Sequence, residues 1–105
     1  MAAQSITVFR SRLRPDAPDD YLTLADELEQ RARTFPGFVE FKMFAAADGE
    51  RLALVTFASA DAEAAWRDDE QHRTAQQRGR TEFYDEYDVA VCTVERRHRW
   101  APSGA

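Results

Sequence analysis

This sequence has a single cysteine, no long apolar run and no excess of positive charge. Cys92 is the only cysteine among 105 residues, so a framework of internal disulfides is excluded. No apolar stretch approaches the roughly 20 residues that a membrane-spanning helix needs. The N-terminus lacks the basic and apolar segments of a secretory signal. The sequence therefore predicts a soluble cytoplasmic protein with no membrane partner, and Cys92 is expected to be buried within a strand.

The balance of charge is acidic, with a formal net charge of −5 and a pI near 5.0. Binding to nucleic acid or to an anionic membrane draws its free energy from clustered cations, so nucleic acid is not expected as a partner. Two arginine-rich stretches occur at residues 10–14 and 96–99. Acidic residues surround both in the sequence, and we interpret them as solvated surface.

The pattern of apolar residues predicts an alternation of strands and helices. Alternation over residues 5–13 indicates a strand, and a three-and-four spacing from Tyr21 to Ala32 indicates a helix that stops at Pro36. Two strands joined by an Asp-Gly turn, a capped helix, a break and a second helical piece are expected next, with a last strand at the end. These elements span residues 38–46, 51–58, 59–67, 70–78 and 87–97.

The order of elements, βαββαβ, predicts an α+β domain of the ferredoxin-like type with an antiparallel sheet. We assign residues 1–100 to this single domain and residues 101–105 to a flexible tail. Gly79 is expected to end the last helix in the left-handed conformation. The strand at 51–58 carries apolar residues on both faces, with Leu52 and Leu54 on one face and Val55 and Phe57 on the other. Helices can cover one face only, so we expect a homodimer to cover the other.

Several short motifs resemble the antibiotic biosynthesis monooxygenase (ABM) domains of the dimeric α/β-barrel superfamily. The resemblance runs from Ile6 to about Arg99. Its carriers are Phe35-Pro-Gly-Phe38, Leu54-Val-Thr-Phe57, Ala64-Ala-Trp66-Arg67, Glu70-Gln-His72-Arg73 and Phe83-Tyr84. It implies a dimeric α/β barrel, a ligand cavity between the sheet and the helices, and oxidation of a small aromatic, phenolic or quinol-type molecule by dioxygen. It also implies that no cofactor and no metal take part, which agrees with the lack of a Gly-rich phosphate loop or a metal-ligand cluster in the sequence.

Three residues are the candidate catalytic groups. Trp66 could form an aromatic wall and donate its indole N–H to a substrate oxygen, although it could equally be a core anchor. His72 could accept a phenol proton, or could lie on a wet helix surface. Tyr84 could position the substrate through its hydroxyl, or could pack in the core or at an interface.

Five further residues are candidate substrate-binding groups. Arg73 and Arg12 could hold a substrate oxygen anion, although isolated arginines more often form exposed ion pairs. Phe41 and Met43 share one strand face and could form an apolar cavity floor. Tyr87 lies beside the acidic pair that follows Tyr84 and could also contact substrate.

Two alternative functions remain open at this point. Haem-degrading relatives of the superfamily use a helical histidine and a first-strand asparagine, but alignment on Trp66 places Gln76 and Phe9 at those positions. Glutamine is a poor haem ligand beside imidazole, which argues against this activity. The other alternative is a dimer that binds a small molecule without turnover, including a stress-response protein.

Overall fold

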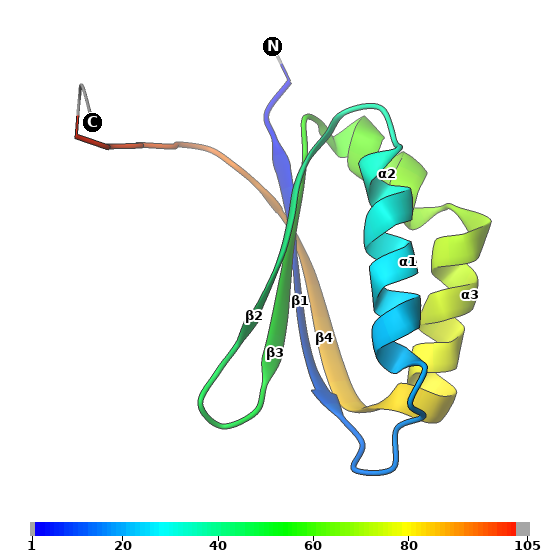
Figure 1. Ribbon diagram of the computed structural model, residues 1–105. Helices are drawn as coiled ribbons and strands as arrows, with labels where there is room; N and C mark the ends of the chain where they lie inside the picture. Colours follow the sequence, from blue (N-terminus) through cyan, green and yellow to red (C-terminus); the bar gives the residue numbers. More distant parts are fainter. Residues whose placement is uncertain (1, 103–105) are drawn as a thin grey trace.

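A single four-stranded antiparallel sheet, with helices packed on one of its faces, forms the body of the protein (Figure 1). The computed structural model describes residues 2–102. The strands lie in the order β2-β3-β1-β4, so the first strand is central and the last is at an edge. This arrangement confirms the predicted α+β, ferredoxin-like fold.

The sheet register fixes which side chains face the helices. β1 (Ser5–Leu13) pairs with β3 (Arg51–Phe57) and with β4 (Tyr84–Thr93), and Thr7 lies opposite Val55 and Val91. β2 (Phe38–Ala45) pairs with the outer edge of β3. Because side chains alternate between faces, the odd-numbered residues of β1 and β3 lie under the helices.

α1 (Tyr21–Arg33) begins after two prolines and ends just before Pro36, as expected from the sequence. The turn into β2 depends on Gly37, which has a φ of +84°. A Cβ atom at this position would lie 2.8 Å from the Cβ of Ala62. Gly37 is therefore required both by the backbone conformation and by the close approach of α2 (Ala60–Arg67).

The two short helices that follow β3 both begin at capping side chains. The Ser59 hydroxyl accepts a hydrogen bond from the N–H of Ala62 at the start of α2. The Asp69 carboxylate accepts one from the N–H of His72 at the start of α3 (Glu70–Arg78). Asp69 also receives two hydrogen bonds from the Arg31 guanidinium, at 2.9 and 2.7 Å, which join α1 to α3.

Two boundary predictions near the end of the chain are wrong. Gly79 has a right-handed φ of −57° and opens a π-helical turn, Gly79–Phe83, instead of closing α3 in the left-handed conformation. A Cβ atom at Gly79 would lie 2.7 Å from the Tyr84 ring, so close packing is what requires a glycine there. The last strand spans Tyr84–Thr93, not residues 87–97: its polar start pairs with β1 at an exposed edge, and residues 94–97 have no strand structure.

The sheet face away from the helices is covered by nothing in the described chain. Cys92 is exposed on this face, so the prediction of a buried thiol is wrong for the single chain. Phe44 shares the face and is 43% exposed. Residues 101 and 102 are exposed and have no regular structure, and the rest of the predicted tail lies outside the described residues. In the described part of the chain, no helix has the length and apolar character needed to cross a membrane.

Candidate ligand cavity between the sheet and the helices

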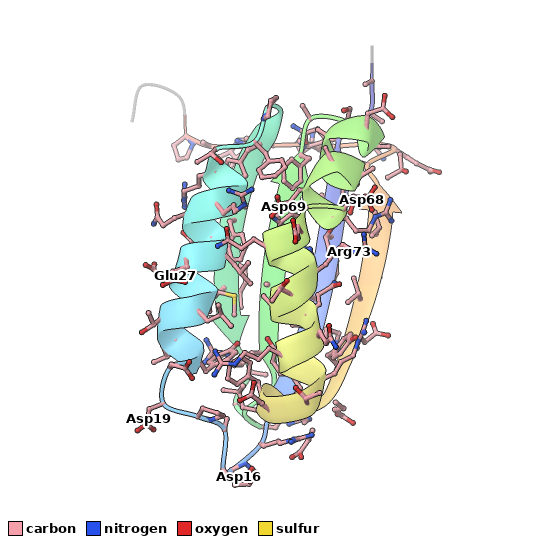
Figure 2. The ribbon with its side chains drawn as sticks, turned by 90° about the vertical axis from the view of Figure 1, so that its right-hand side faces the viewer. Asp16, Asp19, Glu27, Asp68, Asp69 and Arg73 are labelled. Carbon is pink, nitrogen blue, oxygen red and sulfur yellow. The ribbon has the colours of Figure 1, made fainter. Side chains whose placement is uncertain are left out.

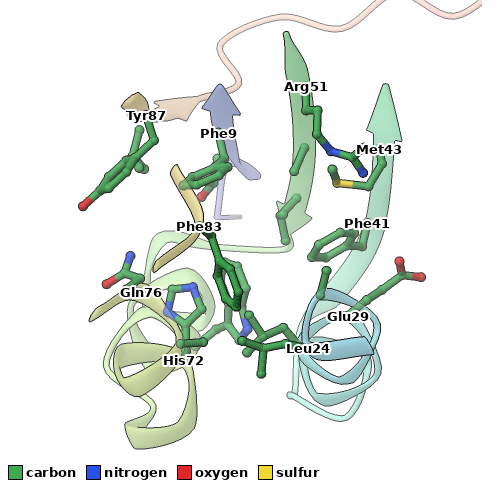
Figure 3. A pocket seen from close by; sticks show the side chains of 18 of the residues that line it. Phe9, Leu24, Glu29, Phe41, Met43, Arg51, His72, Gln76, Phe83 and Tyr87 are labelled. Atoms are coloured by element: carbon green, nitrogen blue, oxygen red, sulfur yellow. The ribbon is translucent and has the colours of Figure 1, made fainter. Parts of the chain in front are cut away.

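A cavity of about 290 Å³ lies between the helices and the covered face of the sheet (Figure 3). Phe9, Phe41 and Met43 reach it from the strands, and His72 and Gln76 reach it from α3. Pockets of this size hold small organic molecules. The aromatic lining residues are Phe9, Tyr21, Phe41, Trp66, Phe83, Tyr84 and Tyr87.

Trp66 and His72 stand together at one end of this cavity. Trp66 is 6% exposed and belongs to the core cluster with Val55 and Phe57. The His72 ring lies against the indole, with ring centroids 4.2 Å apart. Trp66 therefore acts as a core anchor and a cavity wall at once, which unites the two interpretations made from the sequence.

The His72 imidazole is held in one protonation state by its surroundings. Its Nδ1 lies 3.4 Å from the carbonyl oxygen of Arg67, which can only accept, so a hydrogen bond there places a hydrogen on Nδ1 and makes Nε2 the acceptor of the neutral ring. Burial lowers the pKa of His72 below its ordinary value of 6.5, although the Arg67 carbonyl and the Asp69 charge oppose this shift. His72 is therefore neutral and able to accept a proton at neutral pH.

A cluster of aromatic rings forms the other end of the cavity. Tyr21 meets Phe83 and Tyr84 edge to face, with centroids 5.2 and 5.9 Å apart. The Tyr84 hydroxyl donates to that of Tyr21 at 3.5 Å. Burial, reinforced by this hydrogen bond, raises the pKa of Tyr84 far above its ordinary value. Tyr84 is thus a neutral phenol that can hydrogen-bond a ligand but cannot serve as a base.

Three polar atoms in the cavity lining are buried and have no hydrogen-bond partner among the described residues. They are the hydroxyl oxygen of Thr7, the Nε of Arg51 and the indole nitrogen of Trp66. Buried polar groups are nearly always paired, because an unpaired one costs about 1–3 kcal/mol. The residues that carry these atoms line the cavity, although each atom itself has almost no accessible surface.

Two ionisable residues of the lining, Glu63 and Arg51, were not singled out from the sequence. Glu63 is 3% exposed, and burial raises the pKa of its carboxyl group, with Arg67 opposing the shift from 3.5 Å. Its position three residues before Trp66 places both on one helix face, which is the signal that could have found it. Arg51 follows an Asp-Gly-Glu turn and looks like surface, but its register beside Ser11 turns it inward.

The cavity brings together Trp66, His72, Tyr84, Phe41, Met43 and Tyr87, whereas two of the predicted residues lie elsewhere. Arg12 pairs with Asp48 at 2.8 Å and with Glu86 at 3.3 Å, outside the cavity. Arg73 is exposed on the outer side of α3 (Figure 2). Both arginines therefore lie outside the cavity, as the alternative interpretation of each allowed. Among the described residues, no three His, Cys, Asp or Glu side chains are grouped so that they could hold a metal ion.

Comparison with known proteins agrees with this architecture. The sequence pattern of the antibiotic biosynthesis monooxygenase family matches residues 5–78. The chain belongs to the ABM family. A relative from Bacillus subtilis (strain 168), the uncharacterised protein YqjZ, is 29% identical over 90 residues, which are 86% of this chain and 79% of that protein.

Solved structures share the ABM fold at low sequence identity. SnoaB from Streptomyces nogalater, a cofactor-independent oxygenase crystallised as a mutant, superposes with a TM-score of 0.77 at 15% identity, over 91% of this chain and 97% of that one. Rv0793 from Mycobacterium tuberculosis superposes with a TM-score of 0.76 at 19% identity, over 94% of this chain and 100% of that one. These likenesses establish a monooxygenase-like fold.

Proposed function

We propose that this ABM-family protein is a cofactor-independent monooxygenase that oxidises a phenolic or quinol-type aromatic molecule with dioxygen. The observation that carries the proposal is the pairing of Trp66 and His72 in the cavity: a buried indole N–H without a partner among the described residues lies beside a neutral imidazole with a free acceptor nitrogen. The fold shared with SnoaB, which is described as a cofactor-independent oxygenase, supports the same activity.

In this mechanism the chain binds and activates the ligand. The aromatic walls exclude water and hold a planar ring. His72 accepts the phenol proton at Nε2, and the electron-rich anion can then donate an electron to dioxygen. For an anthrone, the overall reaction removes two hydrogens from the ring methylene, one oxygen atom of O₂ becomes its carbonyl oxygen, and the other leaves as water. The Trp66 N–H stabilises the oxygen anion that develops on the ligand, and the Tyr84 hydroxyl positions the ring.

The proposal includes a homodimer working in the cytoplasm. On the uncovered sheet face, Leu52 and Leu54 are only half-buried and Phe44 is 43% exposed. A second copy related by a two-fold axis would remove this apolar surface from water. Equilibrium sedimentation at micromolar concentration is expected to give the mass of a dimer; a profile that fits monomer alone would contradict this part of the proposal.

Oxygen uptake is the test of the activity. Purified, metal-stripped protein should consume dioxygen with one or more members of a panel of anthrones, naphthalenediols and reduced quinones, and isotopically labelled dioxygen should label the product. Trp66→Phe and His72→Ala should each lower kcat/KM by about 100-fold or more, while Arg73→Ala, outside the cavity, should have no effect. Because the pKa of His72 lies below 6.5, the wild-type rate should fall only as the pH drops below that value.

Failure of this test has a defined meaning. No uptake from folded protein across the whole panel would favour the alternative of a dimer that binds its ligand without turnover. Uptake that persists in both cavity variants would mean that the site has been assigned wrongly.

A further inference from the structure

One charged residue of the cavity lining, Arg51, has no ion-pair partner among the described residues. Arg51 is the first residue of β3, and its guanidinium points into the cavity beside Met43 (Figure 3). Its Nε is buried and has no hydrogen-bond partner among residues 2–102, and it forms no ion pair with any of their carboxylates. The guanidinium carbon lies 5.7 Å from the centroid of the Tyr21 ring.

Of the three acidic residues in the lining, two contact arginines other than Arg51 and the third is exposed. Glu29 accepts hydrogen bonds from Arg33, the shorter at 2.8 Å, and Glu63 lies 3.5 Å from Arg67. Asp26, the third lining carboxylate, is exposed. Arg51 is thus a permanent positive charge that faces an apolar, aromatic space without a described anion to balance it.

The distance between Arg51 and the Trp66 end suits an elongated ligand. Arg51 pairs with Ser11 on β1, whereas Val55, which packs with Trp66, pairs with Thr7. Four residues along a strand correspond to about 13 Å at roughly 3.3 Å per residue. Figure 3 shows Arg51 and His72 on opposite sides of the cavity. The polar groups of the lining therefore form two separate sites with aromatic rings between them.

We infer that Arg51 is an anion-binding subsite, and that the ligand is an aromatic acid: a planar ring system with a carboxylate at the Arg51 end and a hydroxyl or carbonyl oxygen at the Trp66 end. A guanidinium offers paired N–H donors that match a carboxylate, and the low-dielectric surroundings strengthen that pairing. This inference rests on the proposed function for the chemistry at the Trp66 end, but it concerns binding alone.

Calorimetric titration with three matched probes tests the subsite: 6-hydroxy-2-naphthoate, its methyl ester and 2-naphthol. The wild type should bind the carboxylate about tenfold or more tightly than the ester, in line with the strength of charge-assisted hydrogen bonds. Arg51→Gln should remove this preference while leaving the ester affinity unchanged, and Arg51→Lys should retain part of it. Arg10→Gln, which lowers the net charge equally on the other sheet face, should keep the full preference.

Three results would overturn the inference. The first is equal affinity of the wild type for the carboxylate and the ester, and the second is an equal loss of carboxylate and ester affinity in both Arg51→Gln and Arg51→Lys. The third is that no probe binds at millimolar concentration. Oxygen uptake by the same protein preparation, measured on the panel of anthrones, naphthalenediols and reduced quinones, separates this inference from the proposed function. A carboxylate preference without uptake supports the subsite and contradicts the oxygenase, whereas uptake without a carboxylate preference does the reverse.

Discussion

The two ends of the cavity are stabilised in different ways. Both have an aspartate–arginine ion pair between the α1 region and the α3 region. At the Trp66 end the pair is Arg31 with Asp69, whose side chain is 9% exposed and also caps α3. At the Tyr84 end it is Asp20 with Arg78, and the Asp20 side chain is 52% exposed. Exposed pairs contribute little to stability. The Trp66 end therefore combines ring packing with a buried carboxylate that also caps α3, while the Tyr84 end depends mainly on the packing of aromatic rings.

This difference has a functional meaning. The proposed proton acceptor, His72, lies in the first turn after the Asp69 cap, so its placement is tied to an ionised carboxylate. Tyr84 is placed by ring contacts and by the absence of a side chain at Gly79. Conditions that disturb charges should thus act on the chemical end first and leave the aromatic end in place.

The largest effect is expected from crowding the Trp66 end. Gly37→Ala should destabilise the protein by about 3 kcal/mol, because it combines a positive φ with a contact of 2.8 Å to Ala62. Gly49→Ala is the matched control: its φ is +91°, but nothing lies within 4 Å of the added Cβ, so a loss of about 1 kcal/mol is expected. Urea unfolding measures both. Equal losses would show that the approach of α2 to Gly37 has no energetic weight.

A smaller effect, with a reversal of sign, is expected at the Tyr84 end. Gly79→Ala should cost about 1 kcal/mol, since the gain in helix propensity is outweighed by the 2.7 Å contact with the Tyr84 ring. In a Tyr84→Ala background the ring is gone, and the same change should stabilise the protein by a few tenths of a kcal/mol. The near-UV circular dichroism of the tyrosines should change in the single variant. Destabilisation of similar size in both backgrounds would contradict the packing argument.

The smallest expected effect is on the pH dependence of stability, which should differ between the Arg31–Asp69 and Asp20–Arg78 ion pairs. Arg31, which donates two hydrogen bonds to Asp69, lowers the pKa of that carboxyl group from 3.8 to about 2. The stability that the ionised Asp69 carboxylate contributes is therefore present above pH 3.8 and is lost as the pH falls toward 2. The urea midpoints of wild type and Asp69→Asn should converge over this interval. Asp20→Asn should change the acid limb less, because the Asp20 carboxylate is half exposed to solvent; a larger change for Asp20→Asn would reverse the comparison.

Much of the fold could be predicted from the sequence, because period-two and three-to-four spacings determine strands and helices directly. β1 and α3 have the predicted bounds, and β3 differs from its prediction by one residue. The start of β4 could not be found, since Tyr84, Asp85 and Glu86 mix polar and aromatic residues as an exposed edge strand does. The conformation of Gly79 was predicted wrongly for a related reason. A glycine that close packing requires cannot be distinguished in the sequence from one that a positive φ requires.

The site was less accessible to sequence reasoning than the fold. Trp66, His72 and Tyr84 were singled out for their chemistry, and the structure places all three in one cavity. Whether a polar atom has a partner depends on packing across elements distant in sequence, so the unpaired indole of Trp66 and the isolation of Arg51 among the described residues could not be inferred. Arg12 and Arg73 show the converse: Arg12 pairs with a neighbouring carboxylate and Arg73 is exposed to solvent, so neither guanidinium reaches the cavity.

The central position of β1 has a consequence for the synthesis of the protein. Ser5 pairs with Thr93, so one edge of β1 stays unpaired during synthesis until β4 has left the ribosome. At roughly 5–20 residues per second, about 4–18 s pass between the two. During that time β1 can form its ladder with β3 only, and its other backbone edge stays open to pairing with neighbouring chains. Beside Phe9, three of its inward positions carry small hydroxyl residues, Ser5, Thr7 and Ser11, which reduces the apolar surface that this unpaired strand presents.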